Sequence, residues 1–272
     1  MKKASLLLLA VAALAAGAFA QNTSKAEAFA QQAQNDGQVQ PLGTGVCQST
    51  FTSGSGFAYM KFCTTQNGNV AKFESPSTFD QLHQGGEGYG VCDLTNNSNV
   101  RYYDWGVYGD SGWQAATITQ PNGPNTFPLT ITRSTSDDVW TLKQVFSRNT
   151  ATPAVNVSMT LTNNSTVTRQ VNLSRFADVE ADGQSVNWFD ATGTAAFGHY
   201  VFGLMMRHIS IAGMVLGGYI VPPGTTDPCN INLVNGAPYK GDAATLLLWT
   251  FYAGNSIAPG KSKTAVLEYR SF

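Results

Sequence analysis

The sequence predicts an all-β protein, a large two-layer antiparallel β-sandwich with little helix. Three observations support this fold class. Only 12% of the 272 residues are charged, against about 25% in an average soluble domain, and Gly, Thr, Ser and Asn take their place. Apolar and polar residues alternate with period two in several segments that short turns separate. After residue 40, no amphipathic pattern extends over three helical turns.

The first twenty residues have the features of a bacterial secretory signal peptide. Lys2 and Lys3 precede the apolar run 6–16, and small residues occupy positions −3 and −1 of a cut before Gln21. The run is shorter than the about 20 residues of a spanning helix, so we expect no membrane span in the mature chain. No cysteine stands at the cut, which argues against a lipid anchor. The expected location is secreted or periplasmic.

Two parts are expected after the signal peptide. Residues 21–40 are rich in Gln, Ala and Asn, which predicts a mobile leader. Residues 41–272 have the length of one large β domain. Loss of residues 1–20 leaves 14 basic and 17 acidic residues, a net charge of −3. This chain lacks the basic surface of a nucleic-acid-binding protein.

The four cysteines predict two disulfides. No C-x-x-C pair is present, so a zinc ribbon or a thioredoxin-type motif is unsupported, and an oxidising compartment favours cross-links. Cys47 and Cys63 are equidistant from Ser55 in a Ser-Gly-Ser-Gly turn, so a hairpin would bring them together. Cys92 and Cys229 then remain to pair. Four buried free thiols are the alternative.

Strand patterns follow along the chain. Alternation in 127–131, 140–146, 155–162 and 171–174 predicts four strands of an antiparallel meander. Two more apolar segments, 201–221 and 245–252, fit central strands of a sheet covered on both faces. Arg207 and His208 argue against reading the first of them as a membrane span. A final strand is expected at 264–269.

Two short runs resemble a type of large secreted bacterial β-sandwich. These are Val-Ser-Met-Thr-Leu-Thr-Asn-Asn-Ser at 157–165 and Ile-Ala-Pro-Gly-Lys-Ser at 257–262. The resemblance implies the supersandwich architecture of galactose mutarotases and of domains in carbohydrate-active enzymes. Mutarotases use histidines and a glutamate around a sugar ring. His83, His199 and His208 match no motif of theirs, so no catalytic residue is transferred.

An acidic loop predicts a calcium site. Asp178, Glu180 and Asp182 alternate before Gly183, a spacing at which carboxylate oxygens converge on a cation. The twelfth position is Phe189, which excludes an EF-hand. Arg175 offers one positive charge against three negative ones. The alternative is a solvated acidic turn.

An aromatic and acidic segment predicts a carbohydrate-binding surface. Aromatic rings stack on sugar C–H faces, and carboxylates accept hydroxyl hydrogens. The residues concerned are Tyr102, Asp104, Trp105, Asp110 and Trp113. The alternative is that they fill the core. His83, His199 and His208 could form a three-histidine metal site or could be structural histidines. The structural interpretation is preferred, because no short ligand pair such as H-x-H supports the metal site.

These features lead to two hypotheses about function. The first is a non-catalytic exported protein, structural or ligand-binding, with carbohydrate or envelope glycan as ligand and no cofactor except calcium. The second is a carbohydrate-active enzyme, an epimerase, lyase or glycosidase, that uses an acidic cleft. A glycosidase requires two carboxylates roughly 5 to 10 Å apart. Besides the acidic residues named above, Asp190 is a candidate for such a pair. No G-x-S-x-G sequence supports a serine hydrolase.

Overall fold

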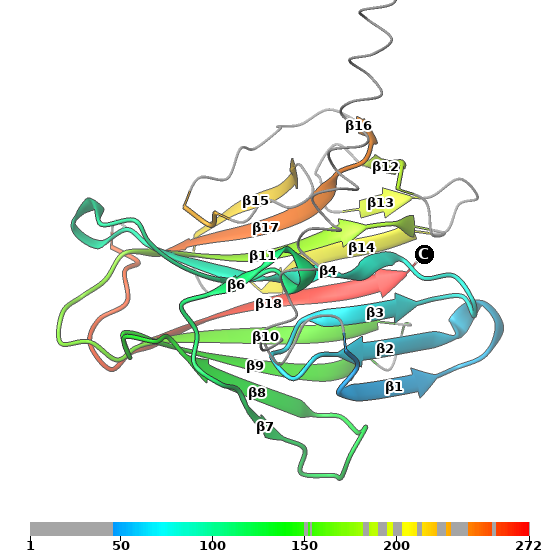
Figure 1. The fold of residues 1–272 in the computed structure, drawn as a ribbon, viewed down its shortest axis with the longest axis horizontal. Coiled ribbons are helices and arrows are strands. Elements are labelled where there is room, and N and C mark those ends of the chain that lie inside the picture. The colour runs from blue at the N-terminus through cyan, green and yellow to red at the C-terminus, as the bar shows by residue number, and fades with distance from the viewer. Residues whose placement is uncertain are drawn as a thin grey trace, which may run out of the picture. The chain divides into compact units, whose positions relative to one another are not determined.

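The computed structural model describes residues 46–149, 152, 154–181, 185–189, 195–197, 203–210, 214–221, 227–229, 239–251 and 254–271 (Figure 1). The signal peptide, the leader, Asp182, Asp190 and His199 lie outside these ranges, so the predictions made for them stay predictions. In the described part of the chain, strands dominate, and helix is confined to three single turns: η1 (Gly56–Ala58), η2 (Thr95–Asn97) and η3 (Gly106–Tyr108). This confirms the all-β fold class.

Two large antiparallel sheets form the sandwich. The nine-stranded sheet has the order β16 (Tyr239–Gly241), β12 (Asn187–Phe189), β13 (Ala195–Phe197), β14 (Gly203–Ser210), β18 (Ser262–Ser271), β10 (Ala154–Asn163), β9 (Trp140–Asn149), β8 (Leu129–Ser134) and β7 (Thr117–Thr119). The six-stranded sheet has the order β15 (Met214–Val221), β17 (Ala244–Phe251), β11 (Val171–Val179), β4 (Leu82–Asp93), β5 (Val100–Asp104) and β6 (Asp110–Ser111).

A third, smaller sheet accompanies the two large ones. It consists of β1 (Ser49–Ser53), β2 (Met60–Thr64) and β3 (Val70–Glu74), which Figure 1 shows in blue and cyan. Its strands contribute aromatic rings to the main core. Phe51 stacks on Phe127 at 3.9 Å between ring centroids, and Phe62 lies 6.0 Å from Phe146. Burial of these rings keeps the small sheet on the sandwich.

The predicted four-strand meander is wrong in its last member. β8, β9 and β10 are neighbours, as expected, but β11 pairs with β4 and β17 of the other sheet. The alternation in 171–174 does not reflect a solvent-exposed face, because all of the last seven residues of β11 are buried. β17 is buried along its whole length, as a central strand covered on both faces requires.

Both predicted disulfides are present, with Cα separations of 5.5 Å for Cys47–Cys63 and 5.1 Å for Cys92–Cys229. The hairpin register is nevertheless different from the predicted one. Ser53 pairs with Met60, so Cys63 lies opposite Thr50 and not opposite Cys47. The turn η1 occupies the loop and moves the hairpin centre towards β2. Cys47 reaches Cys63 from the chain just before β1.

A buried ion pair lies between the two large sheets. Arg175 of β11 and Glu87 of β4 are both fully buried, and two guanidinium nitrogens donate to the Glu87 carboxylate. The hydroxyl of Tyr269 also donates to Glu87. Arg175 further donates to Gln144 of β9 and to the carbonyl of Gly68. The guanidinium therefore links strands of both large sheets with the turn before β3.

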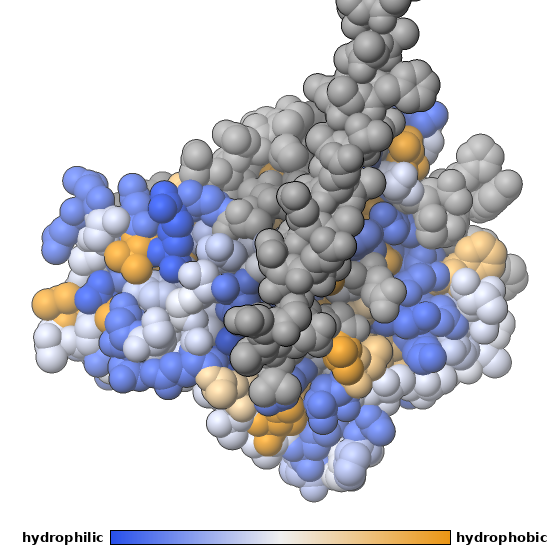
Figure 2. All heavy atoms as spheres, viewed as in Figure 1, coloured by the Kyte–Doolittle hydropathy of each residue, from blue (hydrophilic) through white to orange (hydrophobic). Residues whose placement is uncertain are grey.

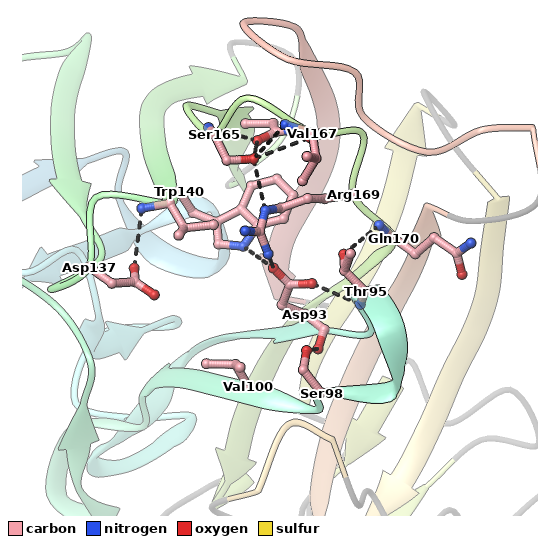
Figure 3. A network of polar contacts seen from close by, with 12 residues as sticks. Asp93, Thr95, Ser98, Val100, Asp137, Trp140, Ser165, Val167, Arg169 and Gln170 are labelled. Atoms are coloured by element: carbon pink, nitrogen blue, oxygen red, sulfur yellow. Dashed lines mark hydrogen bonds and ion pairs between the residues drawn. The ribbon is translucent and has the colours of Figure 1, made fainter.

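A second polar network closes one end of the sandwich (Figure 3). Asp93, at the end of β4, accepts hydrogen bonds from Arg169 at 2.6 Å and from the indole nitrogen of Trp140 at 3.1 Å. Its other oxygen accepts from the backbone of Thr95 at 2.9 Å. Because Trp140 belongs to the nine-stranded sheet, this carboxylate ties the two sheets together where β11 begins.

The surface matches the low charge of the sequence. Among the coloured atoms of Figure 2, hydrophobic residues form small separate groups between hydrophilic ones. Within the described residues, no helix has the length and hydrophobicity that crossing a membrane requires.

Candidate functional site

The outer face of the six-stranded sheet carries a row of glycines that lets another segment lie flat on it. In β4, Gly88 and Gly90 alternate with the core residues Glu87, Tyr89 and Val91. A Cβ on Gly88 would come within 1.8 Å of the Asp104 carbonyl oxygen, and one on Gly90 within 2.7 Å of the Trp105 ring. Only glycine accommodates this approach. The turn η3 therefore rests directly on β4.

This packing brings the side chain of Tyr108 to the end of β11. The Tyr108 hydroxyl donates a hydrogen bond to Asp178 Oδ2, and its ring packs edge-on against Phe176, 6.1 Å between centroids. Its ring also lies parallel to His83, at 6.0 Å and 24°. His83 Nδ1 is 2.9 Å from Glu180 Oε1. Three distant segments thus meet at one place.

We call His83, Tyr108, Asp178, Glu180 and Asp242 the outer-face cluster. Asp242 directly follows β16 and lies near enough to raise the pKa values of His83 and Asp178. The side chains of His83 and Glu180 are 29% and 28% exposed, whereas Asp178 is 3% exposed. The cluster therefore has a wet edge, the His83–Glu180 pair, and a buried carboxyl group behind it.

Burial and like charges set the proton affinity of the cluster. Burial raises the pKa of Asp178 to about 7, and the charges of Asp242 and Glu180 add to this rise, while the Tyr108 hydrogen bond and His83 oppose it. The hydrogen bond to Glu180 raises the pKa of His83, against the effect of its own burial. Near neutral pH the cluster contains a carboxyl group that titrates, Asp178, beside an imidazole whose protonated form the Glu180 carboxylate stabilises.

We expect Asp178→Asn to flatten the pH dependence of stability between pH 4 and 7. The Asp178 pKa is raised on folding, so the native state holds a proton that the unfolded chain releases. That contribution is complete below pH 4 and is lost as the pH rises through about 7. Urea unfolding at several pH values measures it, and the difference between wild type and variant isolates Asp178 from Asp110, whose pKa is raised to about 6. Parallel curves for the two proteins would contradict the assignment.

The predicted aromatic and acidic segment makes its described contacts inside the protein. Asp104 is 2% exposed and Trp105 is fully buried, and the Tyr102 hydroxyl donates to Asp137 at 2.6 Å. Asp104 and Asp110 share Arg133, at 2.7 and 3.1 Å. Trp113 packs on the same guanidinium, 5.6 Å from its ring centroid. Asp110 and Trp113 keep partial exposure, and carbohydrate binding by this segment stays a prediction.

The calcium site also stays a prediction. Asp178 and Glu180 belong to the outer-face cluster, and Asp182 lies outside the described residues. No group of three or more potential metal ligands occurs in the part of the chain that is described. The one positive charge considered for this loop, that of Arg175, does not reach it, because residues 175 and 178 point to opposite faces of β11 and Arg175 is held by Glu87.

Sequence reasoning missed how the outer-face cluster assembles. The sequence suggests His83 only as a ligand of a three-histidine metal site, and it suggests no functional role for Tyr108 or Asp242. Glu180 was assigned to calcium, and its partner His83 is 97 residues away in sequence. The available signal was the alternating glycines of β4, which indicate close approach of another backbone.

Comparison with known proteins adds a likeness of fold. No protein-family model and no curated protein matches the chain. A bacterial glucoamylase solved in complex with acarbose is similar to 83% of this chain, with a TM-score of 0.60 and 7% identity; the match spans 32% of that protein. This chain thus corresponds to about a third of the glucoamylase.

Two further structures align over most of both chains. One is a protein of Escherichia coli K12 assigned as an aldose 1-epimerase, with a TM-score of 0.48, 13% identity and coverage of 82% of this chain and 99% of that one. The other is a galactose mutarotase-related enzyme of Lactobacillus acidophilus, with a TM-score of 0.41, 8% identity and coverage of 82% and 97%. Of the three, the glucoamylase, with its TM-score of 0.60, shows a likeness of fold to this chain.

Proposed function

We propose that the protein is an exported, non-catalytic β-sandwich that binds carbohydrate at the outer-face cluster. The observation that carries this proposal is the partly exposed His83–Glu180 pair beside the ring of Tyr108. An imidazole and a carboxylate offer a donor and acceptors to sugar hydroxyls, and an aromatic ring beside them offers an apolar face.

Two further points support the proposal. The two disulfides fit a protein that leaves the reducing cytoplasm, in line with the expected signal peptide. The fold is shared with a glucoamylase that was solved with acarbose bound. At 7% identity this likeness concerns the fold, so the sugar assignment depends on the cluster.

The test is a glycan array followed by calorimetry on residues 21–272. We expect one class of saccharide to bind, and His83→Ala and Glu180→Gln each to weaken binding about tenfold or more, the size of losing a charged hydrogen bond. Lys143→Gln, an exposed charge change in β9, is the matched control. Saccharide binding that neither cluster variant alters would refute the assignment of the site.

A second candidate function is a carbohydrate-active enzyme. The observation in its favour is Asp178, whose pKa of about 7 poises it to exchange a proton near neutral pH, next to His83 and Glu180. An epimerase would exchange the anomers of a pure α-sugar, which NMR follows directly, and a glycosidase or lyase would release new reducing ends. Turnover that Asp178→Asn abolishes would replace the non-catalytic proposal with this one.

A further inference from the structure

Trp188 differs from the other four tryptophans in its exposure. It is 49% exposed on β12, whereas Trp105, Trp140 and Trp249 are fully buried and Trp113 is partly buried. Its neighbours Asn187 and Phe189 point into the protein. Val186, two positions before Trp188, is 50% exposed. Tryptophan is enriched at interfaces, where one part of the ring is apolar and packed and the other is wet.

A positive charge accompanies the exposed ring. Trp188 pairs with Lys240 of the edge strand β16, and Lys240 Nζ lies 4.6 Å from the centre of the indole ring. Lys240 is itself exposed. No carboxylate of the described residues lies within ion-pair distance of its ammonium group. The pair therefore combines an apolar ring face with a cation available to an anion.

The pair lies next to the outer-face cluster. The Asn187 side chain bonds the backbone on both sides of Glu180, accepting from Ala181 N at 2.9 Å and donating to Val179 O at 2.8 Å. On the partner strand, Asp242 follows Lys240 by two positions, about 7 Å along an extended chain. The backbones of the two places are therefore adjacent, and the Trp188 side chain points to the face of β12 opposite to Asn187.

We propose that Trp188 and Lys240 form a subsite for an acidic sugar residue, a uronate, of the saccharide that the protein binds. This inference rests on the proposed function and narrows its ligand class. The indole ring stacks on the C–H face of the sugar. The ammonium group, on its flexible stem, pairs with the sugar carboxylate. A neutral sugar would use the ring alone and would leave the cation unused.

The test compares charged and uncharged forms of the same saccharide. The probes are four-residue oligomers of galacturonate, of mannuronate and of glucuronate, each with a counterpart in which the carboxylates are reduced to alcohols. Quenching of tryptophan fluorescence, assigned to Trp188 by its loss in Trp188→Ala, and calorimetry report binding to the disulfide-bonded protein. We expect at least one acidic oligomer to bind about tenfold more tightly than its reduced form, and the preference to shrink with added salt.

Three variants separate the subsite from a merely structural pair. Trp188→Ala should weaken binding of the acidic oligomer about tenfold with little change in melting temperature, because the ring is half exposed. Lys240→Gln should remove the preference for the acidic form and keep binding of the reduced form. Lys143→Gln should change neither. A ring and cation that only stabilise the sheet edge would lower the melting temperature in the first two variants and leave binding unchanged.

The outcomes also separate this inference from the proposed function. If His83→Ala weakens saccharide binding and Trp188→Ala does not, the cluster binds sugar and the subsite is refuted. If Trp188→Ala weakens binding and His83→Ala does not, the subsite stands and the cluster is refuted as the main site. Equal binding of acidic and reduced oligomers, or binding of none of them, overturns the uronate assignment.

Discussion

Arg175→Met is expected to lower the free energy of unfolding by about 3 to 5 kcal/mol, the cost of leaving one member of a buried ion pair without its partner. Glu87 would remain fully buried with its charge unmatched. Arg175→Lys should recover little of the loss, since one ammonium group cannot reach Glu87, Gln144 and the Gly68 carbonyl together. Urea unfolding of the purified variants measures the difference.

The matched control for Arg175 is Arg101, an exposed arginine whose Nε lies 2.6 Å from Asp227 Oδ1. Arg101→Met should cost less than about 1 kcal/mol, because water screens an exposed pair. The double variant Arg175→Met, Glu87→Leu removes both charges, and we expect it to be more stable than Arg175→Met alone. If Arg175→Met is no more harmful than Arg101→Met, the buried pair does not hold the sheets together.

Replacing Cys92 and Cys229 by serine should cost about 5 kcal/mol, the larger of the two disulfide effects. The bond closes a loop of 137 residues, and the chain-entropy model ties stabilisation to the logarithm of loop length. The Cys47–Cys63 bond closes 16 residues, so the same change there should cost about 3 kcal/mol. Thermal unfolding of the two double variants compares them. An equal loss would show that loop length does not govern stability here.

The sequence predicted the fold class because period-two alternation and turn residues are local signals. It did not predict which sheet receives β11. Asn172 and Ser174 alternate with apolar residues like a wet face, although Ser174 is buried and its hydroxyl donates to the Gly90 carbonyl. Likewise, Arg175 looked available to the acidic loop, because nothing near it in sequence showed that Glu87 would enclose it.

Both predicted disulfides are confirmed, but the argument that paired Cys47 with Cys63 was incomplete. Elimination paired Cys92 with Cys229, and the structure agrees. Symmetry about Ser55 paired Cys47 with Cys63, but the hairpin centre is elsewhere. The outer-face cluster was beyond such arguments, because Tyr108 reaches Asp178 from 70 residues away. Its assembly depends on how closely Asp104 and Trp105, the residues just before η3, approach Gly88, a property of the folded backbone.

The position of β18 has a consequence for the order of folding. Ser262–Ser271 is the last described strand in the chain, yet it lies between β14 and β10 in the middle of the nine-stranded sheet. Until it is synthesised, the sheet exists as two separate halves with open strand edges. Such edges pair readily with other chains, and a sheet of long-range pairings closes slowly. The nine-stranded sheet can therefore close only after its last described strand has been synthesised.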